Sequence, residues 1–200
     1  MGLATFIGGI HPYEGKELSE DKPIKVLEPL QGEIMVYPLS QHIGAPAKPL
    51  VAKGDHVLKG QIIAEAGGFI SANVLSSVSG TVKGIESKLV ANGAMVQSIL
   101  VENDGEEEAI EGFGTDRDAT KLSKEEIRKI VKDAGIVGLG GAGFPTHVKL
   151  TPKDENAIDY VIVNGAECEP YLTSDYRTMM ERPEQIIGGL KVMLQLFDNA

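Results

Sequence analysis

The sequence predicts a mixed α+β protein, with an all-β amino-terminal half followed by an incomplete α/β domain. The first observation is a series of short apolar runs between residues 26 and 102 that are separated by glycine turns, a pattern typical of a small sandwich or barrel. The second is the return of helical periodicity after residue 121 around a single β-branched run at 160–164. Because one buried strand and its helices cannot close an α/β core, we expect the second domain to be incomplete at Ala200.

Composition and charge indicate an ordinary soluble protein and exclude several classes of function. The 200 residues are 42% hydrophobic and 24% charged, and the net charge of -10 argues against a general role in binding nucleic acid. No apolar run approaches the ~20 residues of a membrane span, and the amino terminus lacks a signal peptide, so we expect a cytoplasmic chain without a transmembrane segment. The single cysteine, Cys168, excludes a disulfide and a four-cysteine cluster, and the histidines lack metal-ligand spacing, so we expect no metal site.

Residues 1–25 are expected to form an extended arm, and the strands of the first domain are expected in the four apolar runs that follow. These runs are 33–39, 49–66, 72–87 and 94–103. They contain V-x-x-G-D-x-V-x-x-G-Q over residues 51–61 and S-G-x-V over 79–82. This part resembles the barrel-sandwich hybrid of lipoyl and biotinyl carrier domains, where these patterns mark the two halves of a flattened barrel. The carrier's modified lysine would fall in residues 69–75, which contain no lysine, so we expect a docking or structural module instead of a swinging arm.

An acidic, glycine-containing stretch follows the barrel, and we expect residues 109–120 to be a solvated linker. The next segment, 122–134, has helical periodicity. Ser123 is a good N-cap, Glu126 three residues later completes a capping box, and Gly135 ends the helix.

Five glycines lie within residues 135–143, and three of them, Gly138, Gly140 and Gly143, form the pattern G-x-G-x-x-G. The pattern is typical of a Rossmann turn, but that turn joins a strand to a helix, and the residues before this loop predict a helix. From these residues alone two interpretations stay open. Backbone N–H groups of the loop bind an anion or a cofactor, or the loop is a tight turn that needs the positive φ of glycine.

Three more elements are expected beyond the glycine loop. A short helix begins at Pro145, because proline suits the first turn of a helix. The β-branched run 160–164 predicts a buried strand with a functional loop at its carboxyl end. A last helix begins near Pro183 and runs through Phe197.

Two glycine-bearing stretches, GLGGAGFPTHVK and VNGAECEPYLTSDYR, carry a more specific resemblance. Together they resemble the FMN-binding core of the flavoprotein subunit of respiratory complex I. With the opening GGIHPYEGKELS and the barrel placed before the flavin domain, the whole chain is most similar to the C subunits of Rnf complexes. The resemblance implies an arm (1–25), a barrel-sandwich hybrid (26–108), a linker (109–120) and the amino-terminal part of an α/β FMN- and NADH-binding domain (121–200).

The resemblance also implies a set of cofactor-binding residues. Backbone groups that would line FMN belong to Gly138, Gly140, Gly141, Ala142 and Gly143. Phe144 would supply an aromatic face, Lys149 a cation, Asn164 an amide at the flavin edge, and Glu167 the family's acidic site residue. Taken singly, these four side chains also have structural interpretations: a core anchor, a solvated helix lysine, a turn cap and a loop carboxylate. No catalytic residue is assigned.

The neighbouring residues are expected to have structural roles. Ala166 stands where complex I carries an acid, so one polar contact of that relative should be missing. We expect Glu169, Asp175 and Arg177 to form an ion pair that shapes the loop, and Cys168 to be a spectator.

Rnf complexes exchange electrons between ferredoxin and NAD and couple this exchange to ion pumping. The resemblance therefore implies FMN as cofactor, NAD(H) as substrate, and [4Fe-4S] clusters downstream of these residues. The implied partners are other subunits of a membrane electron-transport complex and, indirectly, ferredoxin, with a peripheral location on the cytoplasmic side of the membrane. These residues alone are expected to be inactive. Two alternatives stay open: a non-catalytic docking or assembly module, and a subunit of a related soluble flavin and iron–sulfur reductase for cobalamin or amino acids.

Overall fold

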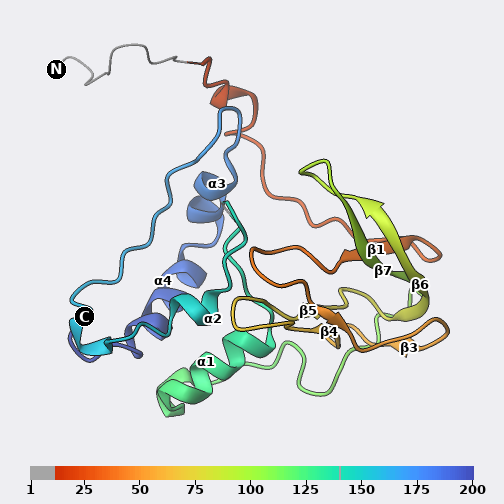
Figure 1. The fold of residues 1–200 in the computed structure, drawn as a ribbon. Helices are drawn as coiled ribbons and strands as arrows, with labels where there is room; N and C mark the ends of the chain where they lie inside the picture. Colours follow the sequence, from red (N-terminus) through yellow and green to blue (C-terminus); the bar gives the residue numbers. More distant parts are fainter. Residues whose placement is uncertain (1–11, 140) are drawn as a thin grey trace. The chain divides into compact units, whose positions relative to one another are not determined.

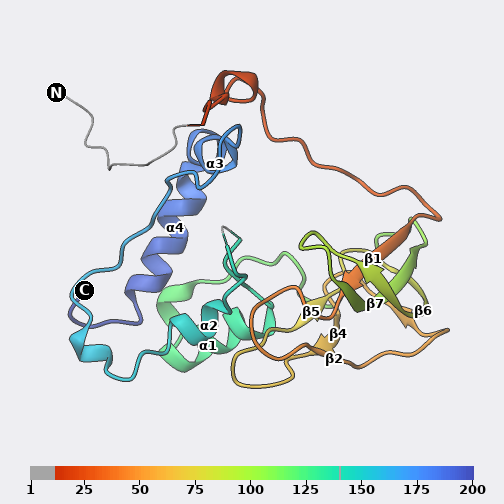
Figure 2. The same cartoon turned by 45° about the horizontal axis from the view of Figure 1, so that its top comes forward.

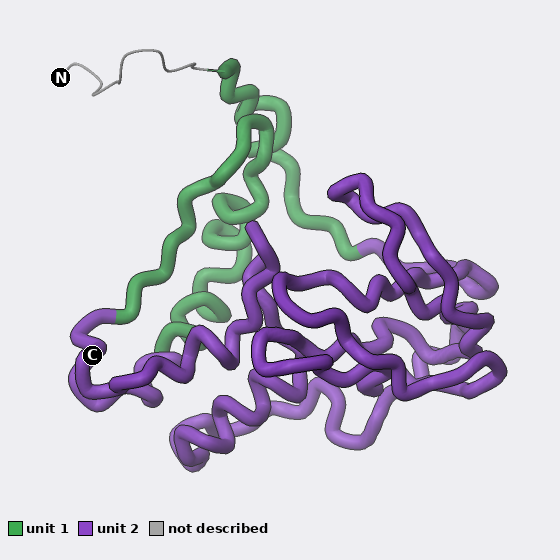
Figure 3. Tube along the Cα trace, in the orientation of Figure 1, with its two compact units in different colours: residues 1–26, 161–191 green, residues 27–160, 192–200 purple. Residues whose placement is uncertain are grey.

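The computed structural model describes residues 12–139 and 141–200, and the chain forms two compact units (Figure 3). The smaller unit combines the described part of residues 1–26 with residues 161–191, and the larger unit combines residues 27–160 with residues 192–200. Part of the predicted arm (residues 1–11) and Gly140 of the glycine loop lie outside the described residues.

The amino-terminal part of the larger unit is an all-β domain (Figure 1). Its strands are β1 (Ile34–Pro38), β2 (Lys48–Pro49), β3 (His56–Val57), β4 (Ile62–Glu65), β5 (Val74–Leu75), β6 (Gly80–Leu89) and β7 (Met95–Asn103). They form two antiparallel sheets, one in the order β1-β7-β6-β3 and the other in the order β2-β4-β5. Each apolar run that predicted strands contains at least one of them, so the all-β prediction for this half is confirmed.

Both sheets contribute to a single hydrophobic core. Val57 of β3, Ile63 of β4 and Ile99 of β7 are completely buried there. The glycine of the S-G-x-V pattern, Gly80, is required where β6 meets β7. A Cβ added to Gly80 would lie 2.0 Å from the carbonyl oxygen of Glu102, so any larger residue would separate the two strands.

The acidic segment after β7 is exposed but attached to the barrel. The backbone N–H of Lys59 donates to the carbonyl of Glu108 (2.9 Å), and the Lys59 ammonium pairs with Glu107 (2.7 Å). Asp104 accepts hydrogen bonds from the hydroxyl of Ser79 (2.6 Å) and from His56 Nε2 (2.9 Å). The solvated linker therefore begins only after a stretch that hydrogen-bonds to the β-domain, and the domain boundaries given above stay predictions.

Two helices of the larger unit flank the glycine loop and lie side by side (Figure 2). They are α1 (Lys124–Asp133) and α2 (Thr146–Lys149). Ser123 and Glu126 form both halves of the predicted capping box. At the other end of α1, Gly135 adopts φ +63°, and Ile136 N–H donates to Val131 C=O (3.3 Å), which together make a Schellman motif. The predicted start and stop of this helix are thus confirmed.

The last helix, α4 (Pro183–Leu194), begins where the sequence predicts. It ends three residues earlier than predicted, and the chain then turns so that Leu196 and Phe197 are buried. Asn199 donates a hydrogen bond to the carbonyl of Asn156 (2.8 Å) in the single-turn helix η3 (Glu155–Ala157), which fixes this end of the chain within the larger unit.

The smaller unit contains η1 (Lys16–Leu18), α3 (Ser174–Glu181) and α4 as far as Lys191. The prediction of a buried strand over residues 160–164 is wrong for this structure, because the segment has no regular structure and the Ile162 side chain is 84% exposed. A β-branched run forms a strand only when another strand satisfies its backbone N–H and C=O groups, and no described segment pairs with this one.

Neither a membrane-spanning helix nor a metal-binding cluster is present in the described residues. None of the helices within 12–139 and 141–200 combines the length and the apolar character needed to cross a bilayer. In the same ranges, no group of three or more histidine, cysteine or acidic side chains is arranged to hold a metal ion.

Candidate functional site

The glycine loop joins α1 to α2 and is closed at its base like a hairpin. Val137 and Pro145 form an antiparallel bridge, Gly138 N–H donates to Phe144 C=O, and Thr146 N–H donates to Ile136 C=O, both at 2.9 Å. The loop is therefore not the strand-to-helix turn of a Rossmann fold, as its helical flank predicts.

The tip of the loop is hydrogen-bonded to the β-domain within the larger unit. Ile43 N–H donates to Ala142 C=O (3.0 Å). Gly143 has φ +63°, and a Cβ added there would lie 2.8 Å from the Gln41 carbonyl oxygen. Both the backbone angle and this close approach require glycine at 143. The tight-turn interpretation thus accounts for Gly143.

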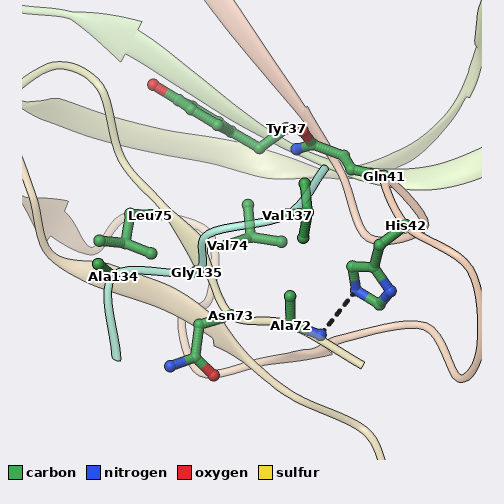
Figure 4. A pocket seen from close by; sticks show the side chains of 10 residues that line it. All are labelled: Tyr37, Gln41, His42, Ala72, Asn73, Val74, Leu75, Ala134, Gly135 and Val137. Carbon is green, nitrogen blue, oxygen red and sulfur yellow. Dashed lines mark hydrogen bonds between the residues drawn. The ribbon is translucent and has the colours of Figure 1, made fainter. Parts of the chain in front are cut away.

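The segment that holds the loop is itself fixed by a buried histidine that the sequence analysis did not identify as important. His42 Nε2 lies 3.1 Å from the Ala72 nitrogen (Figure 4). His42 Nδ1 lies 3.1 Å from the Ile43 carbonyl oxygen. Because Ala72 N–H can only donate and Ile43 C=O can only accept, the imidazole carries its proton on Nδ1. No local sequence pattern marks His42, since its partner Ala72 lies in another apolar run.

A cavity of about 760 Å³ opens between the loop and the β-domain. Its walls come from the segment 38–43, from the turn between β6 and β7, and from the glycine loop. The lining residues are Pro38, Ser40, Gln41, His42, Ile43, Leu89, Val90, Ala91, Asn92, Val137, Gly138, Leu139, Gly141, Ala142 and Gly143. A Cβ added to Gly141 would meet no atom within 4 Å, so this glycine leaves open the space that a side chain would occupy.

The chemistry of this cavity suits an uncharged ring better than a phosphate. None of the described lining residues is an acid, a lysine or an arginine, whereas apolar side chains and backbone groups make up much of the wall. Its volume falls in the range of about 300 to 1,000 Å³ that is typical of small-molecule sites. The residues present therefore fit the ring system of a flavin.

Asn164 and Glu167, the two other predicted cofactor residues, belong to the smaller unit. Asn164 Oδ1 accepts from Ala166 N–H (3.0 Å), which is the turn-capping role. Glu167 Oε1 accepts from the N–H groups of Asp175 (2.7 Å) and Tyr176 (3.1 Å) and so caps the first turn of α3.

Comparison with known proteins identifies the family. Residues 4–106 match the family model of the RnfC barrel sandwich hybrid domain, which is more than half of the chain. This chain belongs to the RnfC family. Residues 131–200 also match the family model of the Nuo51 FMN-binding domain, so the glycine loop and the loop with Asn164 and Glu167 both fall in a region related to flavin-binding proteins. The predicted order of the two domains, barrel-sandwich hybrid first and flavin-type domain second, is confirmed.

Three curated relatives illustrate the similarity. The chain is 43% identical over 196 residues to the C subunit of the proton-translocating ferredoxin:NAD(+) oxidoreductase complex of Clostridium ljungdahlii, a match that covers 98% of this chain and 42% of that relative. It is 44% identical over 194 residues to the Na(+)-translocating counterpart of Acetobacterium woodii (96% of this chain, 43% of the relative). It is 43% identical over 188 residues to the C subunit of the ion-translocating oxidoreductase complex of Rhodobacter capsulatus (93% and 36%). The chain spans about two fifths of the length of these relatives.

The two side chains that follow the glycine loop of this RnfC-type chain are accessible. Phe144 is partly exposed beside the loop, and Lys149, at the end of α2, is exposed. Between them, His147 is partly buried, and this burial lowers the pKa of its imidazole; the charge of Lys132 lowers the pKa further. His147 is thus neutral at neutral pH. The assignment of Phe144 and Lys149 to a cofactor stays a prediction.

The expected ion pair of Arg177 needs correction. The Arg177 guanidinium pairs with Glu181 one turn further along α3 (2.5 Å), and its Nε donates to the same carboxylate (2.7 Å). The partner is therefore not Glu169 or Asp175. A carboxylate four residues away on the same helix face is reached without bending the loop, which favours this pairing.

Proposed function

We propose that this chain is the flavin-binding amino-terminal part of the C subunit of an ion-translocating ferredoxin:NAD oxidoreductase complex. Two observations support the proposal. The chain matches the family models of both domains in the order that such a protein requires, and its relatives include C subunits named for proton, sodium-ion and ion translocation.

The structural observation that carries the proposal is the glycine loop held against the β-domain at the rim of an uncharged cavity. Backbone groups of Gly138, Gly141, Ala142 and Gly143 would line FMN there. FMN supplies the change between two-electron and one-electron transfer that links NAD(H) to iron–sulfur carriers. The protein residues would position the cofactor.

The wider role follows from the same proposal. NAD(H) would be the two-electron substrate, the [4Fe-4S] clusters would be bound by residues outside this chain, and ferredoxin would be reached through them. The partners would be the other subunits of the complex, at the cytoplasmic face of the membrane. These 200 residues alone would not pass electrons from FMN to a cluster, because their single cysteine cannot hold one.

Flavin binding by the full-length gene product that contains this chain tests the proposal. Gly138 borders the cavity, and a Cβ added there would have no neighbour closer than 3.9 Å, so Gly138→Val should project its methyl groups towards the space assigned to FMN. We expect FMN to bind the unmodified protein and to bind Gly138→Val about tenfold or more weakly, measured by quenching of flavin fluorescence.

Gly188→Val is the matched control. Gly188 lies in α4, where a Cβ would also meet nothing within 4 Å, so the same substitution should leave FMN affinity unchanged. Absence of FMN binding to the unmodified protein would contradict the proposal and would favour the alternative of a docking module built on a barrel without a modifiable lysine.

A further inference from the structure

The described part of the amino-terminal arm contacts the loop that carries Glu167. The cofactor assignment uses no residue of this arm. The arm and the loop both belong to the smaller unit. Tyr171 N–H donates to Glu14 C=O (2.6 Å), and the Lys16 ammonium donates to the carbonyl oxygens of Glu169 (2.9 Å) and Leu172 (2.7 Å). One lysine of the arm thus holds two carbonyl groups of a turn about 150 residues away in the chain.

The fit between the arm and this turn is close. Gly15 adopts φ +59°, and a Cβ added to it would lie 2.2 Å from the ring of Tyr171. Tyr171 itself has φ +67°, a conformation that non-glycine residues adopt only where their surroundings impose it. Tyr13 packs edge-on against the same ring, with 6.1 Å between the ring centroids. The arm therefore holds the turn in a conformation that it would not favour by itself.

Further hydrogen bonds continue along the arm. The Ser19 hydroxyl donates to Tyr171 C=O (2.7 Å) and accepts from the Thr173 hydroxyl (3.0 Å), directly before α3. Arg177 of α3 donates to Glu20 C=O (3.1 Å). These contacts connect the arm to both ends of the segment that leads from Glu167 into α3.

The arm and Glu167 line a common cavity of about 460 Å³. It is lined by Pro12, Glu14 and Lys16 of the arm and by Glu167, Cys168, Glu169 and Pro170 of the loop. Lys16 and Glu167 line the same cavity, and the Glu167 carboxylate is held by the N–H groups at the start of α3. The turn joins Glu167 to the start of α3, and the Glu167 carboxylate accepts from the N–H groups there, so the position of the turn and that of the carboxylate are linked.

We propose that Lys16 of the amino-terminal arm is a positioning residue for Glu167, the acidic residue that the family resemblance assigns to the cofactor. The inference rests on the proposed function, because it takes Glu167 to be a cofactor residue. The Lys16 ammonium makes two charge-assisted hydrogen bonds to the turn, and bonds of this kind are stronger than neutral ones. Through this turn Lys16 keeps the Glu167 carboxylate in its position at the first turn of α3.

Lys16→Met in the full-length gene product tests the inference, because it removes the ammonium and keeps an apolar stem. The matched control is Lys22→Met, since the Lys22 ammonium donates to Leu18 C=O within the arm itself. In the absence of added FMN, we expect amide hydrogen exchange at Tyr171, Asp175 and Tyr176 to become about tenfold faster in Lys16→Met and to stay unchanged in Lys22→Met.

Flavin binding supplies the second readout. We expect Lys16→Met to bind FMN about tenfold more weakly, and the visible absorption bands of the flavin that still binds to shift because its surroundings have changed. Lys16→Arg keeps a cation that can donate to both carbonyls and should restore most of the affinity and the absorption bands.

The outcomes separate the two proposals. Unchanged exchange in Lys16→Met overturns the role of Lys16 in holding the turn, whatever the flavin does. Faster exchange with unchanged FMN affinity and spectrum shows a purely structural contact and overturns the positioning role. If the unmodified protein does not bind FMN, the proposed function fails, and the positioning role fails with it, while hydrogen exchange still decides whether Lys16 holds the turn.

Discussion

At the scale of single residues, glycines and one histidine decide how the candidate site is built. Gly143 allows the glycine loop to approach the backbone at Gln41 and His42, and Gly15 allows the arm to approach Tyr171. His42 makes a hydrogen bond with each ring nitrogen, so the segment 38–43, which contacts the glycine loop, is fixed to the backbone at Ala72. Substitutions at these positions should therefore act through geometry and not through lost contact area.

Gly143→Ala should destabilise the larger unit by about 2 to 4 kcal/mol, because an alanine at positive φ is strained by ~1 kcal/mol or more and its Cβ also meets the Gln41 carbonyl. Urea unfolding followed by circular dichroism measures the change. Gly93→Ala is the control, since Gly93 has φ +82° but no atom within 4 Å of the added Cβ. Equal losses for the two variants would show that the contact with residues 41 and 42 does not matter.

At the scale of elements, the acidic segment after β7 has a defined role in closing the β-domain. Asp104 accepts from the Ser79 hydroxyl, from Glu106 N–H and from His56. These interactions, with the Ser79 hydrogen bond the largest, hold the pKa of the Asp104 carboxyl below its usual value of 3.8. The ionised carboxylate thus stabilises the folded chain, and protonation removes that stabilisation.

Asp104→Asn should change the pH dependence of stability. Because the pKa of Asp104 is lowered on folding, its contribution is complete above pH 3.8 and is lost as the pH falls through the lower pKa of the folded state. The difference in free energy of unfolding between the unmodified chain and Asp104→Asn should therefore shrink below pH 3.8. Thermal unfolding from about pH 2.5 to about pH 6 measures it, and a difference that stays constant across that range would contradict this role of Asp104.

At the scale of the whole chain, different interactions stabilise the interior of each compact unit. The larger unit has a hydrophobic core formed by both of its β-sheets. The smaller unit is held by hydrogen bonds from the arm to the turn at 169–173 and to α3, together with the packing of Tyr13 against Tyr171. Its apolar residues of the 160–164 run are largely exposed, as Ile162 illustrates.

Two isoleucine substitutions should report this contrast. Ile99→Ala should lower the free energy of unfolding by about 2 to 5 kcal/mol, because Ile99 is fully buried and its loss leaves a cavity. Ile162→Ala should change it by less than about 0.5 kcal/mol, because Ile162 is 84% exposed. Chemical denaturation of both variants provides the comparison. A large loss in free energy of unfolding for Ile162→Ala would support the buried strand that the sequence predicts.

The features that could be predicted from the sequence alone are those that depend on near neighbours in the chain. Ser123 and Glu126 are three residues apart, so a capping box could be predicted from their spacing, and Gly135 could be predicted to end α1 for the same reason. Alternating apolar runs and glycine turns predicted the strands of the β-domain. Sequence resemblance, which depends on whole motifs, was sufficient to find the family and its two domains.

Contacts between residues that are far apart in the sequence could be identified only from the folded structure. The pair of Arg177 with Glu181 is an exception, because the two residues are only four positions apart and this helical spacing is visible in the sequence. The 160–164 run has the composition of a strand but lacks a paired strand, and a strand requires one. The contacts of Ile43 with Ala142 and of Lys16 with Glu169 join residues about 100 and 150 positions apart, which no local pattern encodes. Such pairs form because packing and hydrogen-bond satisfaction are resolved over the whole fold.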